Sequence, residues 1–433
     1  MEENTQKPRA WVVAVNMGYG HQRTAFPLRN LAPDGKIINA NDYPGIPKED
    51  RVIWEGTRKF YEFISNFKRI FLIGELVFLI FNQFQKIITF YPKKDLSKPN
   101  FQLRQMFSLI ENGWGKHLIA KLKENPLPLI ATFFPQTFMA EFFNYPGDIF
   151  CVVCDADIAR SWATLNPAKS RIKYFVSNSR VVERLKLYGV KKENIFLTGY
   201  PLPLENIGDE KMEILKEDLR YRLFNLDPDK KYLERYKILI KKALGDLPQN
   251  PSHPLTLLFS VGGVGAQKEI ASRILKSLAK KIKEGQIRVI LSAGAREKVK
   301  NYFINRATKI GLADHFGSGI EIIYDPSVEG YFQKFNLALR KSDILWTKPS
   351  ELSFYSALGL PIIIAPSIGS QEEFNMRWLL KSGFGILQED PDYTEEWLFD
   401  WLKKGYLAEA AMEGFVEGEK LGTINIQRII CPH

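Results

Sequence analysis

Short apolar runs alternate with longer amphipathic segments along most of the chain. In the first half, runs of strand length lie at 10–16, 127–134, 148–154, 173–177 and 195–198. In the second half, they lie at 255–261, 287–292, 320–323, 343–346 and 361–365. Apolar residues at helical spacing follow several of these runs, at 179–188, 270–282, 296–310, 329–341 and 371–381. This alternation is typical of parallel sheets covered by helices, so it predicts an α/β protein with two Rossmann-like domains facing one cleft.

A glycine-rich turn follows the run at 255–261. Gly262, Gly263 and Gly265 stand close together, and a helical pattern starts at once. Glycines let the backbone approach an anion, and the free N–H groups of a helix start point toward it. The turn therefore indicates a phosphate site. A tight turn without a ligand fits the pattern equally well, because the Rossmann spacing G-x-G-x-x-G is absent.

A second unit of strand, glycine loop and helix lies near the N-terminus. Gly18, Tyr19 and Gly20 follow the run at 10–16, and His21 comes where the next helix begins. A histidine there can act as a general base, or can bind a phosphate or hydroxyl of a substrate. A capping or merely exposed histidine is the alternative, and the local sequence leaves both open.

Polar residues follow two other strand-like runs. Asp155 ends the run that begins near residue 148, at the carboxyl end of a strand, where α/β folds place ligands. Gln371, Glu372 and Asn375 open a helix after a glycine turn, and the first and last lie on one face. Such side chains can bind the vicinal hydroxyls of a sugar or ribose. A capped helix with a polar first turn fits the same pattern.

Composition restricts the classes of protein that need to be considered. The 433 residues are 45% hydrophobic and 25% charged, which is typical of a globular chain of two or three domains. The net charge of +11 favours anionic partners. Cys151 and Cys154 lie in an apolar run without a second pair or a histidine cluster, so we predict no metal site. Few cysteines and no leader-like segment predict a cytoplasmic protein.

The segment 54–95 combines many aromatic residues with interleaved lysines and arginines. Its most apolar part is too short and too interrupted for a transmembrane helix. Aromatic bulk flanked by basic residues suits a segment that lies on a membrane surface. Core helices with solvated basic faces are the alternative. No RNP-like or OB-like pattern supports binding to nucleic acid, which we do not expect as a partner.

Four segments together resemble the family 28-like glycosyltransferases. These are the lipid-II-forming N-acetylglucosaminyltransferases (MurG), the monogalactosyldiacylglycerol synthases and the processive diacylglycerol glucosyltransferases. The segments are Met17–His21, 173–202, Ser260–Gln267 and Gly369–Asn375. They are similar, in this order, to the family's Gly-x-Gly-His loop, a segment ending in Gly-x-Pro, a second glycine loop and the donor-sugar motif Gly-Gln-Glu-x-x-Asn.

The resemblance implies a GT-B fold whose N-terminal half binds the acceptor and whose C-terminal half binds a nucleotide sugar, usually a UDP-sugar. It also implies inverting transfer to a lipid or lipid-linked acceptor, no cofactor, no obligatory metal, and peripheral attachment to the inner face of an anionic membrane. Carried over by residue, His21 and Asp155 are the catalytic candidates, and which of them is the base stays open. The implied acceptor loop is Gly18, Tyr19 and Gly20. The implied donor site is Gly262, Gly263, Val264, Gly265, Lys348, Ser350, Glu351, Gln371, Glu372 and Asn375.

The chain also departs from that family. Arg160 or Ser161 stands where the lipid enzymes have a histidine, and Lys348–Ser353 replaces their Lys-Pro-Gly-Gly-x-Thr segment in shortened form. A sugar-nucleotide epimerase or hydrolase, or a non-catalytic nucleotide-sugar-binding protein on the same fold, therefore remains an alternative. We expect four parts: an acceptor domain at 1–205, a charged helical insertion or linker at 206–250, a nucleotide-sugar domain at 251–405, and a helical tail at 406–433 packed on the N-terminal domain.

Overall fold

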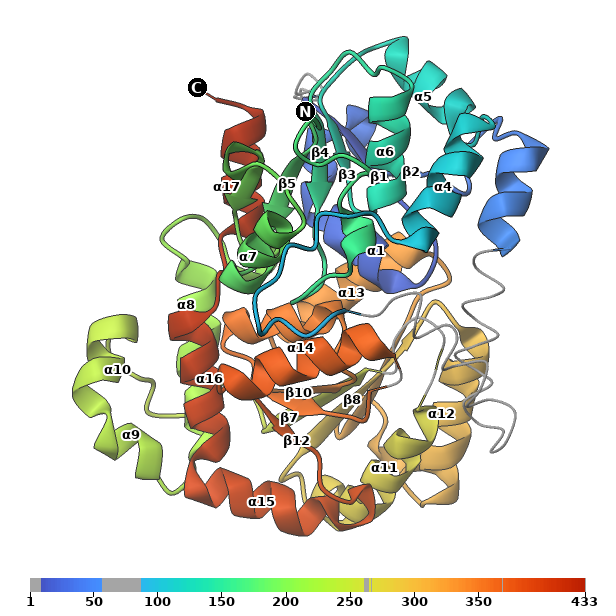
Figure 1. The fold of residues 1–433 in the computed structure, drawn as a ribbon. Helices are drawn as coiled ribbons and strands as arrows, with labels where there is room; N and C mark the ends of the chain where they lie inside the picture. Colours follow the sequence, from blue (N-terminus) through green and yellow to red (C-terminus); the bar gives the residue numbers. More distant parts are fainter. Residues whose placement is uncertain (1–8, 57–86, 261–264, 266, 368, 433) are drawn as a thin grey trace, which may run out of the picture. The chain divides into compact units, whose positions relative to one another are not determined.

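The computed structural model describes residues 9–56, 87–260, 265, 267–367 and 369–432. The chain divides into two compact units (Figure 1). Unit 1 comprises Met1–Leu202, Ile368–Asn375 and Leu421–His433, and unit 2 comprises Pro203–Ser367 and Met376–Lys420. Each unit is therefore assembled from segments that lie far apart in the sequence.

Unit 1 is built on a six-stranded parallel sheet in the order β2-β1-β3-β4-β5-β6. Its strands are β1 (Trp11–Ala14), β2 (Ile38–Asn39), β3 (Leu129–Ala131), β4 (Ile149–Val152), β5 (Lys173–Val176) and β6 (Ile195–Leu197). Its helices include α1 (Tyr19–Ala25), α4 (Phe101–Glu111), α5 (Lys116–Lys123), α6 (Phe134–Phe142), α7 (Ser179–Leu187) and α17 (Gly422–Ile430). Every residue of β3 and β4 is buried, as expected for central parallel strands with both faces covered.

Unit 2 has a second six-stranded parallel sheet, in the order β12-β11-β10-β7-β8-β9. Its strands are β7 (Thr256–Ser260), β8 (Arg288–Gly294), β9 (Ile320–Tyr324), β10 (Ile344–Thr347), β11 (Ile362–Ile364) and β12 (Gly385–Leu387). Its helices include α8 (Glu213–Leu226), α11 (Lys268–Lys283), α12 (Glu297–Lys309), α13 (Val328–Leu339), α15 (Thr394–Lys404) and α16 (Tyr406–Glu417). Helix α14 (Ser370–Lys381) contributes its first turns to unit 1 and the remainder to unit 2.

The strand order reverses at one point in each sheet. In unit 1 the chain passes from β1 to β2 on one side and then to β3 on the other. In unit 2 it passes from β7 to β8 and β9, and then returns to β10 on the opposite side of β7. Open α/β sheets bind ligands outside the carboxyl ends of the strands at such reversals. The carboxyl ends of β1 and β3, and those of β7 and β10, are therefore the candidate ligand sites of the two sheets.

The two helix-covered parallel sheets confirm the predicted α/β class with two Rossmann-like domains. Strands β2 and β12 were not predicted, because they contain only two and three residues and lack a distinct apolar run. Most of the segment 54–95, predicted to be helical, lies outside the described residues. Its part at 54–56 is helical, and its part at 87–95 contains no helix. Among the described residues, no helix is both long enough and apolar enough to cross a bilayer.

Candidate functional site

His21 lies at the strand reversal of unit 1. Strand β1 ends at Ala14, and helix α1 begins after Gly18, whose φ of 104° favours glycine. The His21 ring nitrogen Nδ1 lies 2.7 Å from the backbone oxygen of Thr132, directly after β3. The Thr132 hydroxyl donates in return to the backbone oxygen of His21, at 2.9 Å. This reciprocal pair fixes the imidazole between the ends of β1 and β3.

The Thr132 contact defines which nitrogen of the neutral His21 ring carries the proton. A carbonyl oxygen can only accept, so Nδ1 carries the proton and Nε2 carries the lone pair. Burial of the ring lowers the pKa of His21 from 6.5 to about 4, although the Thr132 hydrogen bond acts in the opposite direction. Phe133 packs on the ring with its centroid 4.5 Å away, and Cys154 Sγ lies 3.6 Å from Nδ1. His21 is therefore neutral at pH 7, and Nε2 can accept a proton.

Asp155 lies beside Asn375 within unit 1. The Asn375 side-chain oxygen accepts a hydrogen bond from the backbone N–H of Ala156 at 2.8 Å. Its amide nitrogen lies 3.4 Å from Asp155 Oδ1. Asn375 is only 1% exposed, and Asp155 is half-buried. The structure thus brings together two predicted site residues, and Asn375 contacts the carboxylate segment that follows β4.

A buried ion pair between Asp157 and Arg184 stabilises the segment that follows Asp155. Arg184 of α7 binds both carboxylate oxygens of Asp157, at 2.8 and 2.7 Å. The Asp157 carboxylate also accepts the backbone N–H of Ile158 at 2.9 Å. Since both side chains are almost fully buried, this bidentate contact holds the chain after Asp155 against the second half of α7.

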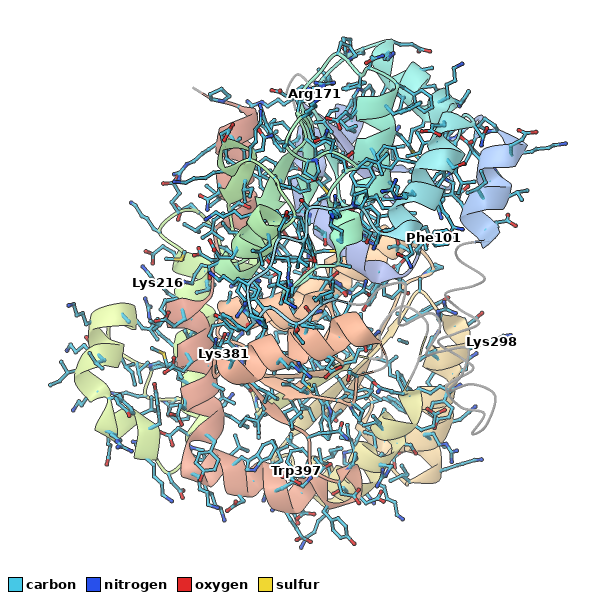
Figure 2. The ribbon with its side chains drawn as sticks, in the orientation of Figure 1. Phe101, Arg171, Lys216, Lys298, Lys381 and Trp397 are labelled. Atoms are coloured by element: carbon cyan, nitrogen blue, oxygen red, sulfur yellow. The ribbon has the colours of Figure 1, made fainter. Side chains whose placement is uncertain are left out.

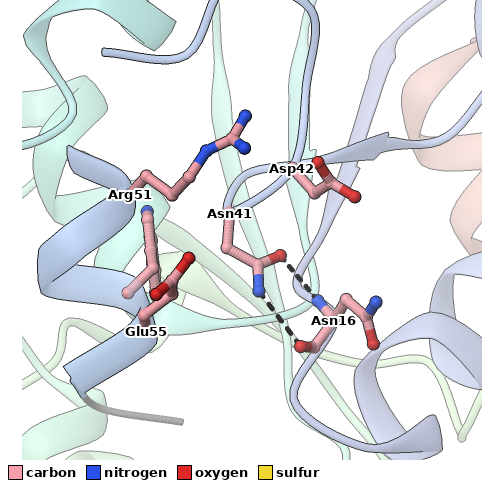
Figure 3. Close-up of a pocket in the computed structure, with 6 residues that line it drawn as sticks. Asn16, Asn41, Asp42, Arg51 and Glu55 are labelled. Carbon is pink, nitrogen blue, oxygen red and sulfur yellow. Dashed lines mark hydrogen bonds between the residues drawn. The ribbon is translucent and has the colours of Figure 1, made fainter. Parts of the chain in front are cut away.

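A pocket of about 170 Å³ lies near the glycine loop in unit 1 (Figure 3). Its lining consists of Asn16, Asn41, Asp42, Arg51, Trp54 and Glu55. Asn41 accepts from the backbone N–H of Asn16 at 2.9 Å and donates to its carbonyl oxygen at 3.0 Å. Gln22, next to His21, donates to Asn39 at 3.1 Å. The segment that contains Asn39 and Asn41 therefore hydrogen-bonds both to Asn16 in the pocket and to Gln22 beside His21.

The second glycine loop follows β7 at the strand reversal of unit 2. Gly262, Gly263 and Val264 lie outside the described residues. Gly265 has a φ of 66°, and a Cβ there would lie 2.8 Å from Val299 Cγ2. Gln267 precedes α11 and donates to the backbone oxygen of Pro366 at 2.6 Å. Gln267 thus ties the start of α11 to the chain that follows β11.

The end of β10 forms the other side of this reversal. Thr347 pairs with Ser260 in the sheet register, and the Ser260 hydroxyl is buried without a hydrogen-bond partner among the described residues. Lys348 follows and is half-buried. The Ser350 N–H donates to the Lys348 carbonyl at 2.9 Å, and Glu351 opens a 3₁₀ helix (Glu351–Leu358). The predicted donor residues Lys348, Ser350 and Glu351 therefore form one turn.

The other predicted donor residues are on α14. Gln371 is half-buried, and Glu372 is 9% exposed. Like Asn375, both belong to unit 1, whereas Gly265, Lys348, Ser350 and Glu351 belong to unit 2. The predicted donor residues are therefore divided between the two units. Their roles stay predictions.

Sequence reasoning missed several residues that shape the site in unit 1. Thr132 acts through its backbone oxygen, and Asn41 binds the backbone of Asn16, so neither has a local sequence signal. Arg184 resembles any basic residue of an amphipathic helix. A signal was available for Asp157, which lies two residues after Asp155 in a strand-end acidic pair.

Known proteins resemble parts of the chain. Residues 248–318 match the family model described as a domain of unknown function (DUF6938). The UDP-N-acetylglucosamine--N-acetylmuramyl-(pentapeptide) pyrophosphoryl-undecaprenol N-acetylglucosamine transferase of Clavibacter sepedonicus is 30% identical over 93 residues. That alignment covers 19% of this chain and 25% of the transferase, so the chain matches about a quarter of the length of this curated relative.

Two solved structures align with most of the chain at low identity. UDP-GlcNAc 2-epimerase from Neisseria meningitidis, bound to UDP-GlcNAc, is 11% identical, with 77% of this chain and 83% of that chain covered and a TM-score of 0.45. MurG from Acinetobacter baumannii is 12% identical, with 76% and 78% covered and a TM-score of 0.43. Both likenesses concern the fold alone.

Proposed function

We propose that this chain is an inverting glycosyltransferase that moves a sugar from a UDP-sugar to a lipid or lipid-linked acceptor. The observation that carries the proposal is the neutral His21 at the β1/β3 reversal, whose Nδ1–H is bound by Thr132 and whose Nε2 can accept a proton. The partial match to an N-acetylglucosamine transferase supports the classes of donor and acceptor.

In the proposed reaction, His21 acts on the acceptor hydroxyl. The hydroxyl oxygen attacks the anomeric carbon from the side opposite the nucleotide, the bond to UDP breaks, and the configuration inverts. Nε2 of His21 takes the hydroxyl proton during the attack. Asp155, which follows β4 and contacts Asn375, is assigned to the same acceptor side as His21, where its carboxylate can accept from an acceptor hydroxyl.

The donor is assigned to the β7/β10 reversal of unit 2. UDP leaves with growing negative charge on its diphosphate. The N–H groups at the start of α11, the Gly265 turn and Lys348 can stabilise that charge without a metal ion. A helix start that follows β7 and a lysine that follows β10 lie at the same edge of the sheet and can bind an anion. This assignment agrees with the role that the resemblance implies.

The acceptor head group is assigned to the pocket beside the His21 loop. Asn16, Asp42 and Arg51 line it with amide, carboxylate and guanidinium groups. Hydroxyl groups of a sugar or polyol can donate to the carboxylate and accept from the other two. A pocket of about 170 Å³ is small, which suits a single polar head group while the apolar remainder of the acceptor stays outside.

Thermal unfolding with a panel of nucleotides and nucleotide sugars tests the donor assignment. A ligand that binds only the folded chain stabilises it by about 2.7 kcal/mol at a hundredfold excess over its Kd. We expect a shift with UDP or one UDP-sugar in the wild type and its loss in Gly265→Leu. Gly285→Leu is the matched control, because Gly285 has a similar φ of 69° and open space around it. No shift with any nucleotide contradicts the proposal.

Turnover with lipid-linked acceptors tests the transfer step. We expect His21→Gln to lower kcat by roughly a hundredfold to ten-thousandfold, the range of a lost general base. The thermal shift with UDP should stay as in the wild type. Consumption of the UDP-sugar in the absence of any acceptor would instead favour an epimerase or hydrolase.

A further inference from the structure

Helix α10 (Lys237–Leu244) leaves two large aliphatic side chains in solvent. Ile240 and Leu244 are each 2% exposed. On the other side, Ile238 is 84% exposed and Leu239 is 62% exposed. The structure therefore contains an aliphatic surface that nothing in the described part of the chain covers, on an element that sequence reasoning treated as a charged insertion or linker.

Helical geometry places Lys242 between the exposed residues Ile238 and Leu239 on the surface of α10. Successive residues of an α-helix turn by about 100°, so Lys242 lies beside Ile238 one turn on, on the side away from the buried Ile240 and Leu244. Ile238, Leu239 and Lys242 thus form the outer face of α10. Figure 1 shows α10 together with α9 (Lys231–Arg235) at the margin of its unit.

Basic residues surround this outer face. The exposed basic residues from the start of α9 to the end of α10 are Lys230, Lys231, Arg235, Lys237, Lys241 and Lys242. The exposed acidic residues close to them are Asp229, Glu234 and Asp246, the last paired with Lys241 at 2.8 Å. The surface therefore joins protruding aliphatic side chains to an excess of positive charge.

We propose that this α9–α10 surface, residues 230–244, docks on an anionic lipid bilayer. Aliphatic side chains that protrude from a helix gain by entering the headgroup region, and lysines beside them are attracted to anionic lipids. A second copy of the chain is a poor occupant, because two such surfaces would bring like charges together. RNA would leave Ile238 and Leu239 without favourable contacts, since its backbone offers phosphate to the lysines only.

The proposal is independent of catalysis. It assigns the membrane contact to α9 and α10 in unit 2, whereas the sequence suggested the segment 54–95. Vesicle binding can be measured without donor or acceptor. An experiment can therefore contradict the docking proposal while the transferase proposal holds, or contradict the transferase proposal while the docking proposal holds. The residues concerned are exposed, which allows their substitution without loss of the core.

Co-sedimentation of the full chain with vesicles tests the surface. One set of vesicles contains phosphatidylcholine with phosphatidylglycerol, and the other contains phosphatidylcholine alone. The aliphatic variant is Ile238→Ser with Leu239→Ser, and the charge variant is Lys241→Glu with Lys242→Glu. The controls are Leu337→Ser, which removes an aliphatic side chain that is 61% exposed on α13, and Lys298→Glu with Lys341→Glu, which reverses two exposed lysines elsewhere. Figure 2 labels Lys298, which lies on α12.

We expect the wild type to bind the anionic vesicles and to bind the neutral ones weakly. Each α10 double variant should bind the anionic vesicles roughly tenfold less or weaker, while its unfolding temperature and those of the controls stay unchanged. Equal loss in the control variants would mean that net charge or general hydrophobicity is responsible, which overturns the proposal. Unchanged binding of the α10 variants, or salt-dependent binding to RNA but not to vesicles, overturns it as well.

Discussion

Asn375 and Ala156 are joined by a hydrogen bond of 2.8 Å although 219 residues separate them. The donor is the backbone N–H of Ala156, and the acceptor is the Asn375 side-chain oxygen. Both residues are 1% exposed. A residue that the sequence pointed to as a sugar ligand therefore also satisfies a buried backbone group next to Asp155.

We expect Asn375→Ala to lower the free energy of unfolding by about 1–3 kcal/mol, because the Ala156 N–H would remain buried without a partner. Urea unfolding measures this loss, with Gln371→Ala as a control on the same helix that should stay close to the wild type. If Asn375→Ala weakened donor binding and left stability unchanged, its role would be that of a ligand only.

The pH dependence of turnover should follow His21. Its neutral form accepts the proton, and its pKa in the folded chain is about 4. The contribution of His21 to kcat should therefore be constant from about pH 8 down to about pH 5 and fall only as the pH approaches 4. A pH–rate profile measures it. A decline centred on the ordinary histidine pKa of 6.5 would show that the ring is not held as described.

His21 should also affect stability in the acid range. The pKa is 6.5 for an ordinary histidine and about 4 in the folded chain, so the unfolded chain binds more protons between these values. The stability contributed by the neutral ring is fully present above pH 6.5 and is lost as the pH falls toward 4, by up to about 3 kcal/mol. The difference in unfolding free energy between the wild type and His21→Asn, measured across this range, should shrink accordingly.

Asp343 should show the opposite dependence on pH. This fully buried carboxyl accepts from the Thr256 N–H and from Asn225, and burial raises its pKa from 3.8 to about 6. The folded chain therefore binds more protons between these values, and the stability from this group is present at low pH and lost as the pH rises through 6. Asp343→Asn should abolish that change, as measured by denaturant unfolding at a series of pH values. An equal pH dependence in the variant would contradict it.

Removing one partner of the Asp157–Arg184 pair should destabilise unit 1 strongly. A single buried charge without its partner costs about 3–5 kcal/mol. We expect Arg184→Met to lose that much and the double variant with Asp157→Leu to lose less, in a double-mutant cycle read by chemical unfolding. The exposed pair Lys173–Asp148, at 3.1 Å, is the control and should contribute less than about 1 kcal/mol.

The fold could be predicted from the sequence to a large extent, because periodicity is a local signal that buried strands and amphipathic helices must carry. The run at 173–177 became β5, and the apolar positions of 270–282 became the buried face of α11. Strand β2 escaped prediction, since two residues at a sheet edge need no apolar run. Its pairing with β1 depends on tertiary contacts that no local pattern encodes.

The candidate site could be predicted only in part. The glycine loop and His21 stand out because a strand end followed by glycines is a short motif. The protonation state of His21 depends on the Thr132 carbonyl, 111 residues away, and on burial of the ring, so the sequence could not supply it. The hydrogen bond between Asn375 and Ala156 and the pocket beside Asn41 are also products of distant segments meeting.

Helix α17 packs against the end of the N-terminal segment of unit 1. The Thr423 hydroxyl donates to Leu202 at 2.5 Å, and Asn425 donates to Thr198 at 2.9 Å. A Cβ on Gly422 would come within 2.2 Å of the Tyr200 carbonyl oxygen. We expect Gly422→Ala to lower the unfolding temperature clearly, whereas Gly56→Ala, with open space at its Cβ, should not.

The same helix sets an order of events during synthesis. A ribosome makes the chain from its N-terminus, so the first 202 residues emerge long before α17 does. During that interval, the backbone oxygens of Thr198 and Leu202 do not yet have their hydrogen-bond donors on α17. The whole of unit 2 is translated in the same interval. Synthesis of unit 1 thus begins before that of unit 2 but ends after it. Until α17 is made, the N-terminal part of unit 1 lacks the helix that packs on it, and the nascent chain has to stay soluble in that state.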